Sequence, residues 1–416
     1  MDKRHYNRYK SLIEKLSYEY KGYNLKHLLP GYFTFAFDDN PLVARDVFKE
    51  FYLSTQLFDL NKVLENELPT FITYLINRSD YHDLAIAAQK SYPDSKVINI
   101  ESLPKKKISP FSISFIRNFF TAFGIVFFRS IKESLMTKLY LVGLIIKILN
   151  YINLVEKAKV PPSVCRYICF NTAYKEESLL TLYFKKRGIE TITMQHGIFC
   201  DFKLVIPFDC INLDNLIADK VLCWGQSTVD YLLTKGFNSS QLILMGNPKY
   251  KNTEIDYIDQ SFTKCLVLLG RQVYISSNNK LLELLKEYNQ KHGNKILFYI
   301  KKHPFLMDHD HKSYASIADN MIFIGKEHSV QEILRSELVN FSIAVNTTAY
   351  YESLALGKIS LRWSESENEE FLGMDDKFYN LQDFESKIEE FENKPQAEVK
   401  EKMKEVIKYV FNPDLQ

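Results

Sequence analysis

Short apolar runs alternate with longer amphipathic stretches along the chain from about residue 164 onward. The apolar runs are typical of buried strands and lie, in this first block, at residues 164–170, 190–194, 219–224 and 241–245. The amphipathic stretches predict helices at residues 175–187 and 227–235, which end at Gly188 and Gly236. Strands that alternate with helices of about ten to fifteen residues favour parallel βαβ units.

A polar stretch at residues 249–263 interrupts this alternation, which then restarts. In the second block we expect strands at 265–269, 295–300, 321–324 and 341–345, and helices at 279–289, 330–336 and 349–356. We therefore predict an α/β protein with two Rossmann-like domains, residues 1–250 and 251–416, that face each other across a cleft. The tail at 383–409 is predicted to be helical and to pack back on the N-terminal domain.

The first hundred residues have a weaker pattern. It predicts a helix at residues 6–20 and strands at 32–37 and 96–100. The order of these strands in a sheet cannot be assigned from the pattern.

Composition supports two domains and adds one local feature. The chain has 416 residues, more than one hydrophobic core usually holds, and its formal net charge of +2 gives no general attraction for nucleic acid. Residues 104–160, however, carry ten Lys and Arg against Glu133 and Glu156, among many Phe, Leu and Ile. This segment predicts basic, aromatic helices that lie on an anionic membrane surface. A pair of ordinary core helices with solvated lysines is the alternative.

Targeting signals and cysteine spacing favour a cytoplasmic protein that is peripheral at the inner face of the plasma membrane. No run reaches the roughly 18 uninterrupted apolar residues of a spanning helix, and the N-terminus lacks the apolar region of a signal peptide. The six cysteines form no close pair of Cys-x-x-Cys motifs, so we expect free thiols and no metal site.

Two histidines follow predicted strands, where an open α/β sheet binds its ligands. Gln195-His196-Gly197 follows the strand at 190–194, and His196 there can remove a proton from an acceptor hydroxyl or hold a phosphate. We expect Gly197 at a sharp turn or a close approach of the backbone to a ligand. The alternative is a histidine that hydrogen-bonds to the backbone at the end of the sheet.

The second histidine belongs to Lys301-Lys302-His303-Pro304, after the strand at 295–300. Two cations and an imidazole at an open sheet edge suit a phosphate or pyrophosphate, and Pro304 fixes the direction of the chain. A solvated charge run is the alternative.

Three further places carry candidate chemistry. Thr347 and Thr348 lie at a strand-to-helix junction that suits an anion, with Glu352 placed to accept hydrogen bonds from ribose hydroxyls; a plain capping box is the alternative. Arg271 follows the first strand of the second half and is a candidate for a phosphate, or a surface arginine. Asp38 and Asp39 form a carboxylate pair after the predicted strand at 32–37 and are candidate catalytic groups.

Five short motifs occur in an order that resembles a known family. They are Gln-His-Gly at 195–197, Cys-Trp-Gly-Gln at 223–226, Gly-Asn-Pro-Lys-Tyr at 246–250, Lys-Lys-His-Pro at 301–304 and Asn-Thr-Thr-x-x-x-Glu-x-x-x-x-Gly-Lys at 346–358. Together they resemble bacterial GT-B glycosyltransferases of capsule, lipopolysaccharide and other surface polysaccharides, in the branch that uses cytidine-activated donors. This branch includes polysialyltransferase-like and Kdo-transferase-like enzymes and the CDP-glycerol glycerophosphotransferases. The likeness covers about residues 160–365.

The resemblance implies roles for individual residues. His303 would bind the donor phosphate and stabilise the departing nucleotide, Thr347 and Thr348 would hold the same phosphate, and Glu352 would bind the ribose. His196 falls where the polyol-phosphate transferases carry a catalytic histidine. The family works without a bound metal or other cofactor, on a nucleotide-sugar donor and a glycan or lipid-linked glycan acceptor.

Two departures from the family keep the mechanism open. Asp38-Asp39 is followed by Asn40 where sialyltransferases have glycine, so the catalytic base is either His196 or one of these carboxylates. The residues after His196-Gly197 also differ from those of the glycerophosphotransferases, which favours sugar transfer over polyol-phosphate transfer. We expect a metal-independent inverting displacement from a CMP-sugar. A CDP-polyol phosphotransferase and a catalytically silent GT-B partner subunit are the alternatives.

Overall fold

The computed structural model describes residues 3–37, 41–65, 67–129, 132–200, 206, 210–250, 255, 258–271, 274–303, 320–365 and 372–412. The chain forms two compact units. Unit 1 comprises Met1–His196, Val205–Cys223 and Leu233–Leu244; unit 2 comprises Gly197–Leu204, Trp224–Leu232 and Met245–Gln416.

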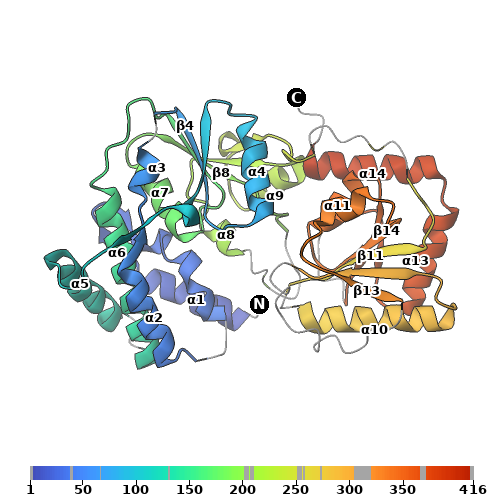
Figure 1. Cartoon of the computed structure of the whole chain (residues 1–416), viewed down its shortest axis with the longest axis horizontal. Helices are drawn as coiled ribbons and strands as arrows, with labels where there is room; N and C mark the ends of the chain where they lie inside the picture. Colours follow the sequence, from blue (N-terminus) through green and yellow to red (C-terminus); the bar gives the residue numbers. More distant parts are fainter. Residues whose placement is uncertain are drawn as a thin grey trace. The chain divides into compact units, whose positions relative to one another are not determined.

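Unit 1 is built around a six-stranded parallel sheet with the order β10-β9-β8-β7-β4-β5. Its strands are β4 (Thr70–Tyr74), β5 (Ser95–Asn99), β7 (Arg166–Cys169), β8 (Glu190–Met194), β9 (Lys220–Cys223) and β10 (Leu242–Leu244). The helices α4 (Ser79–Gln89) and α7 (Lys175–Lys185) follow β4 and β7, as in βαβ units (Figure 1). Every residue of β4 is buried, as expected for a strand covered on both faces.

A helical layer adjoins this sheet in unit 1. It contains α1 (Lys3–Lys15), α2 (Ala44–Ser54), α5 (Ile113–Arg129) and α6 (Leu135–Val155), and α6 packs against both α2 and α5. By length and composition α6 could cross a membrane, but 67% of its most apolar stretch is buried within the protein. This burial is the pattern of a core helix.

Shorter elements complete unit 1. They are β1 (Glu19–Tyr20) and β2 (Tyr23–Asn24), which pair with each other; β3 (Gln56–Phe58) and β6 (Lys105–Lys107), which also pair; the helices α3 (Asn61–Leu64) and α8 (Cys210–Asp214); and the 3-10 helices η1 (Leu25–His27), η2 (Pro30–Phe37), η3 (Ile100–Ser102) and η4 (Ser239–Gln241).

Unit 2 has a second six-stranded parallel sheet with the order β13-β12-β11-β14-β15-β16. The strands are β11 (Lys264–Leu268), β12 (Leu297–Lys301), β13 (Met321–Ile324), β14 (Phe341–Ala344), β15 (Ile359–Trp363) and β16 (Lys377–Phe378). The helices are α9 (Gln226–Thr234), which begins in this unit, α10 (Ile275–Lys291), α11 (Val330–Arg335), α12 (Ala349–Ala355), α13 (Leu381–Asn393) and α14 (Gln396–Phe411).

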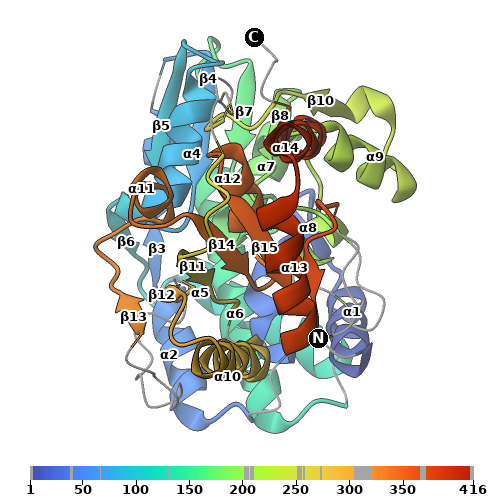
Figure 2. The ribbon, with the colours of Figure 1, turned by 90° about the vertical axis from the view of Figure 1, so that its right-hand side faces the viewer.

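The order of strands in unit 2 fixes where a ligand can bind. The chain runs outward from β11 through β12 to β13 and then returns to β14 on the other side of β11. Figures 1 and 2 both show α10 on one side of the sheet and α14 on the other. The connections after β11 and β14 therefore diverge at the carboxyl edge, and such a switch point is where open α/β sheets bind ligands.

The sequence predictions after residue 164, including the helical tail, agree closely with these elements, and two earlier ones are wrong in detail. Residues 32–37 form the 3-10 helix η2 rather than a strand, since their almost continuous apolar run carries no alternation that separates the two structures. The predicted helix at 6–20 ends at Lys15, and its last two residues form β1. The predicted helical tail is two helices, α13 and α14, with Pro395 at the start of the second.

Gly31 in η2 gives a testable consequence. A Cβ atom on Gly31 would lie 2.3 Å from the carbonyl oxygen of Ala173, so η2 contacts the loop between β7 and α7 through its backbone. We expect Gly31→Ala to lower the free energy of unfolding by about 1–3 kcal/mol, because the two backbones must separate. The control is Gly124→Ala in α5, where an added Cβ meets nothing within 4 Å and should stabilise the helix by about 0.5–1 kcal/mol. Urea unfolding followed by circular dichroism measures both, and equal midpoints would contradict the contact.

Candidate functional site

The loops after three neighbouring strands of unit 2 carry most of the residues expected to bind a donor. Arg271 follows β11, Lys302 and His303 follow β12, and Thr347 and Thr348 follow β14. The three strands are adjacent and parallel, in the order β12-β11-β14. Their carboxyl ends therefore lie at one edge of the sheet, and the structure brings these residues to that edge.

Two residues that the sequence did not single out shape the switch point. Asn278 accepts a hydrogen bond from the amide of Gly270 (2.9 Å) and donates one to its carbonyl (3.1 Å), which holds the loop after β11 against α10. Asn346 has a φ of +44° and donates from its side chain to the hydroxyl of Tyr274 (2.7 Å). A Cβ on Gly270 would lie 2.9 Å from the Val345 carbonyl oxygen, so glycine lets the two loops approach each other.

The paired threonines do not form the capping box that was the alternative prediction. Thr348 occupies the N-cap position of α12, but its side chain makes no capping hydrogen bond. Thr347 instead accepts a bond from the amide of Ala349 (3.3 Å). Both threonines are partly exposed at the sheet edge.

Glu352 lies in the first turn of α12, near Tyr250, the last residue of the Gly-Asn-Pro-Lys-Tyr motif. Tyr250 is 1% exposed, and its hydroxyl accepts a hydrogen bond from Gln331 (2.8 Å). Burial is the largest cause that raises the pKa of Tyr250. The nearby carboxylate of Glu352 raises this pKa further, through its charge and by accepting a hydrogen bond from the hydroxyl. The hydroxyl of Tyr250 therefore interacts with the carboxylate of Glu352. The only sequence signal was the aromatic residue that ends the Gly-Asn-Pro-Lys-Tyr motif.

The two lysines at the carboxyl end of β12, the last residue of the strand and the one that follows it, are not a solvated charge run. Lys301 is 6% exposed and Lys302 is 4% exposed. Lys301 donates to the carbonyl of Gly325, and burial lowers its pKa. The ammonium of Lys302 lies 5.7 Å from the centre of the Phe323 ring. Both lysine side chains are therefore held within the fold at the carboxyl end of β12.

In unit 1 the side chain of His196 is fixed by two asparagines. Its Nε2 atom lies 3.3 Å from Nδ2 of Asn171 and 3.1 Å from Nδ2 of Asn212. The orientation of both amides follows from their other bonds, because Oδ1 of Asn171 accepts from the amide of Ala173 (2.8 Å) and Oδ1 of Asn212 accepts from Asn171 (2.9 Å). Nε2 of His196 is therefore an acceptor, and the ring proton lies on Nδ1.

This arrangement changes what His196 can do. Nε2 accepts from side-chain amides rather than from the backbone, in contrast to the alternative prediction. Its lone pair is the basic site of the ring, so proton abstraction from a substrate at Nε2 requires an amide donor to give way. The ring packs against Phe170 at a centroid distance of 5.2 Å.

The two neighbours of His196 differ in burial. Gln195 is fully buried, and its amide bonds to the carbonyl of Leu222 (3.1 Å), so it belongs to the sheet. At Gly197 an added Cβ meets nothing within 4 Å among the described residues, and φ is not in the left-handed region. No left-handed turn therefore requires glycine here, and the close approach of the backbone to a ligand stays a prediction.

Glu177 in the first turn of α7 is a buried acid near the same strand ends. Its Oε1 accepts from the amide of Phe170 (2.8 Å) and from the hydroxyl of Thr73 (3.2 Å). Burial raises the pKa of Glu177 well above its ordinary value, against the opposing effect of these bonds. The folded protein thus holds a proton here more tightly than the unfolded chain does.

The pH dependence of stability should report this proton. A raised carboxyl pKa contributes stability that is fully present below the unfolded value of about 4.3 and is lost as pH rises through the folded value. Glu177→Gln has no carboxyl to titrate and should not lose this stability. The free energy of unfolding of the variant, relative to that of wild type, should therefore increase from pH 5 to pH 8 by up to about 1.4 kcal/mol per pH unit. Urea midpoints at the two pH values measure it, with exposed Glu14→Gln as the control substitution. A constant difference between Glu177→Gln and wild type would refute a buried protonated carboxyl.

Three predicted site residues, Asp38, Asp39 and Pro304, lie outside the residues that the structure describes. The predicted strand before the two aspartates is the helix η2, so they do not follow a strand. Among the described residues, no group of three or more His, Cys, Asp or Glu could hold a metal ion.

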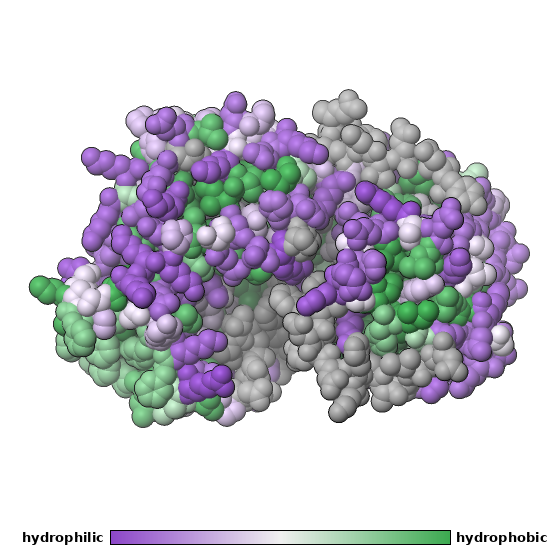
Figure 3. All heavy atoms as spheres, in the orientation of Figure 1, coloured by the Kyte–Doolittle hydropathy of each residue, from purple (hydrophilic) through white to green (hydrophobic). Residues whose placement is uncertain are grey.

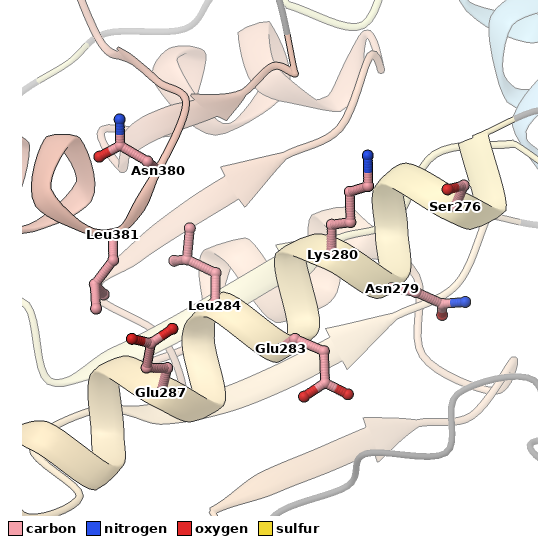
Figure 4. Close-up of a pocket in the computed structure, with 8 residues that line it drawn as sticks. All are labelled: Ser276, Asn279, Lys280, Glu283, Leu284, Glu287, Asn380 and Leu381. Carbon is pink, nitrogen blue, oxygen red and sulfur yellow. The ribbon is translucent and has the colours of Figure 1, made fainter.

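A pocket of about 490 Å³ lies elsewhere in unit 2. Its lining comes from α10 and the start of α13. Figure 4 shows Lys280, Glu283 and Glu287 along α10. None of the residues expected to bind the donor lines it. We therefore base the candidate site on the strand ends rather than on this depression.

No protein-family model matches the chain, and no curated protein matches it. Among solved structures, UDP-GlcNAc 2-epimerase from Neisseria meningitidis bound to UDP-GlcNAc is similar, with a TM-score of 0.50 and 14% identity over 83% of this chain and 97% of that chain. The MnaA–UDP structure from S. aureus has a TM-score of 0.47 and 11% identity, over 83% and 93% of the two chains. An S. aureus TarM mutant in complex with fondaparinux, α-GlcNAc-glycerol and UDP has a TM-score of 0.43 and 14% identity, over 64% and 57%. With its two parallel six-stranded sheets, the chain has the GT-B fold.

Proposed function

We propose that the chain is a glycosyltransferase that moves a sugar from a nucleotide-activated donor to a cell-surface glycan acceptor. A CMP-sugar is the favoured donor, and a capsule polysaccharide or lipopolysaccharide is the favoured product. The observation that carries the proposal is the gathering of Arg271, Lys302, His303 and the threonines 347 and 348 at the ends of three neighbouring strands. Cations, an imidazole and hydroxyls at one sheet edge suit the phosphate of a nucleotide.

Each group has a role in this proposal. Lys302, His303 and the paired threonines stabilise the charge that develops on the leaving phosphate, which is the transition-state interaction that most accelerates such a reaction. Glu352, which interacts with the hydroxyl of Tyr250, accepts hydrogen bonds from the ribose hydroxyls. Asn278 and Asn346 keep the two loops of the switch point in place.

The reaction is a single displacement with inversion. An acceptor hydroxyl attacks the anomeric carbon, the bond from that carbon to the phosphate oxygen breaks, and the electron pair leaves with the nucleotide. A base takes the hydroxyl proton, and His196, Asp38 and Asp39 remain the candidates. For His196 this role requires Nε2 to release one of its two amide donors.

Nucleotide binding tests the proposal directly. The cytidine preference comes from the sequence motifs, whereas the Neisseria structure contains UDP-GlcNAc, so CMP, CDP, UDP and GDP should be compared by thermal shift in metal-free buffer. We expect a cytidine nucleotide at about 100 times its Kd to stabilise the protein by about 2.7 kcal/mol. Stabilisation by UDP instead would refute the cytidine donor, and stabilisation by none of the four would refute a nucleotide-dependent transferase.

A product assay separates sugar transfer from polyol-phosphate transfer. A glycosyltransferase releases the nucleotide with its phosphate and leaves no phosphorus in the new linkage, whereas a CDP-polyol phosphotransferase leaves a phosphodiester. Phosphorus NMR of the purified product therefore decides between them. A phosphodiester signal in the polymer would replace this proposal with the phosphotransferase.

A further inference from the structure

The helix α5 of unit 1 is apolar on the face that points away from the core. The large side chains exposed along it are Ile113, Ile116, Phe120, Phe123 and Phe128, and Phe111 precedes it. Phe111 and Ile113 are each 87% exposed, and Phe128 is 81% exposed. Large apolar side chains that gather on one surface mark a site of interaction. Figure 3 shows green spheres gathered where Figure 1 has α5, at the lower left.

The orientation of α5 is fixed by its opposite face. Phe115, Ala122, Ile125 and Val126 are buried there. Asn118 on the same buried face donates to Asn150 of α6 (2.8 Å), and Asn150 in turn donates to the carbonyl of Ser54 in α2 (3.1 Å). Buried hydrogen bonds of this kind are costly to break. They therefore prevent α5 from rotating about its axis to bury the exposed aromatic side chains.

Basic residues precede and follow α5 in the chain, and one lies on its exposed face. Lys105, Lys106 and Lys107 form β6 just before α5, and all three are exposed. Exposed Arg117 lies on the same side of α5 as the aromatic residues, and exposed Lys132 follows the helix. The only acidic residue between 102 and 155 is Glu133, which forms an ion pair with Arg8 (3.0 Å). The surface therefore combines exposed apolar side chains with exposed positive charge.

We propose that the exposed face of α5, with Lys105–Lys107 and Arg117 beside it, binds the surface of an anionic phospholipid membrane. Aromatic and aliphatic side chains enter the boundary between headgroups and acyl chains, while lysine and arginine bind the anionic headgroups. A symmetric contact between two copies of the chain is disfavoured, because it would bring the same lysines and Arg117 together. The proposal does not depend on the donor site in unit 2.

Vesicle sedimentation of the full chain tests this proposal. Wild type should bind vesicles that contain phosphatidylglycerol and phosphatidylcholine, and should bind pure phosphatidylcholine at least tenfold more weakly. Removing the three positive charges in Lys105→Ser/Lys106→Ser/Lys107→Ser should weaken binding to the anionic vesicles roughly a hundredfold. Phe120→Ser/Phe128→Ser should weaken it at least roughly tenfold. All five substituted side chains are exposed. Neither variant should therefore change the circular dichroism spectrum, which is checked first.

The control is Ile322→Ser, which removes an exposed apolar side chain from β13 in unit 2 and should bind like wild type. Failure of wild type to bind anionic vesicles would overturn the proposal, as would equal binding by wild type and both α5-region variants. Sedimentation velocity tests whether a second copy of the chain binds this face instead. If the chain self-associates, does not bind vesicles, and loses self-association in Phe120→Ser/Phe128→Ser, the face is an interface between copies. That result would also overturn the membrane proposal.

Discussion

Replacement of His303 by alanine is expected to lower the rate of transfer by roughly 10²–10³-fold, the loss that follows removal of one preorganised donor to developing charge. The affinity for the free nucleotide should fall less, by roughly tenfold to a hundredfold, which corresponds to one hydrogen bond to a charged phosphate. The larger effect on rate follows because charge on the leaving phosphate is greater in the transition state than in the bound donor. Stability should change little, since His303 is only partly buried in the loop after β12.

The matched control is His292→Ala. His292 lies at the C-terminal end of α10, and the chain then enters β12 from its amino end, so this histidine is at the opposite edge of the sheet. It pairs with Glu385 at 2.9 Å, and loss of that surface contact should cost no more than about 1 kcal/mol of stability. Thermal shift with the nucleotide that stabilises wild type, followed by donor turnover, measures both variants. Unchanged nucleotide binding in His303→Ala would mean that the phosphate site is not at this sheet edge.

Most strands after residue 164, and the edge at which the candidate residues gather, could be predicted from the sequence, whereas β4 and β15 were missed. Runs such as residues 190–194 and 321–324 coincide with β8 and β13, because short runs rich in β-branched and aromatic residues favour strands. Once the strands are parallel, residues that follow them must share an edge, which is why Lys302, His303 and Thr347 could be grouped without coordinates.

The sequence could not show how side chains far apart in the chain meet. The burial of Lys301 and Lys302 depends on β13 and the loop after it. The bond between Tyr250 and Gln331 joins residues 81 positions apart. The bonds of His196 to Asn171 and Asn212 join the loop after β8 to the loop after β7 and to helix α8. Asparagine and tyrosine are common in loops, so none of these residues stood out by type.

The largest expected effect on stability concerns the ion pair between Arg362 of β15 and Asp376. Arg362 is 6% exposed and Asp376 is fully buried, and the guanidinium binds both carboxylate oxygens at 2.8 and 2.9 Å. Oδ1 of Asp376 also accepts from the amide of Met374 (2.8 Å). The guanidinium carbon of Arg362 lies 4.8 Å from the centre of the Tyr350 ring in α12, so the pair supports the helix that carries Glu352.

We expect Asp376→Asn to lower the free energy of unfolding of unit 2 by about 3–5 kcal/mol, because it leaves a buried cation without its counter-charge. The asparagine has nearly the same shape, but its NH₂ group must face a donor of Arg362 or the amide of Met374. Asp375→Asn is the control, since this neighbouring carboxylate is exposed, lies 3.4 Å from Lys387 and has a φ of +62° that asparagine tolerates. It should cost less than about 1 kcal/mol.

Tryptophan fluorescence can follow this loss in unit 2 alone. The chain has two tryptophans, Trp224 and Trp363, and both belong to unit 2. Trp363 ends β15 next to Arg362 and donates to the hydroxyl of Ser277 (2.9 Å), so its emission should change when this sheet unfolds. In urea, the fluorescence midpoint of Asp376→Asn should fall well below those of wild type and Asp375→Asn. Equal midpoints for the two variants would mean that the buried pair contributes no more than a surface contact, and that α12 is held by its apolar packing against β14, β15 and α14.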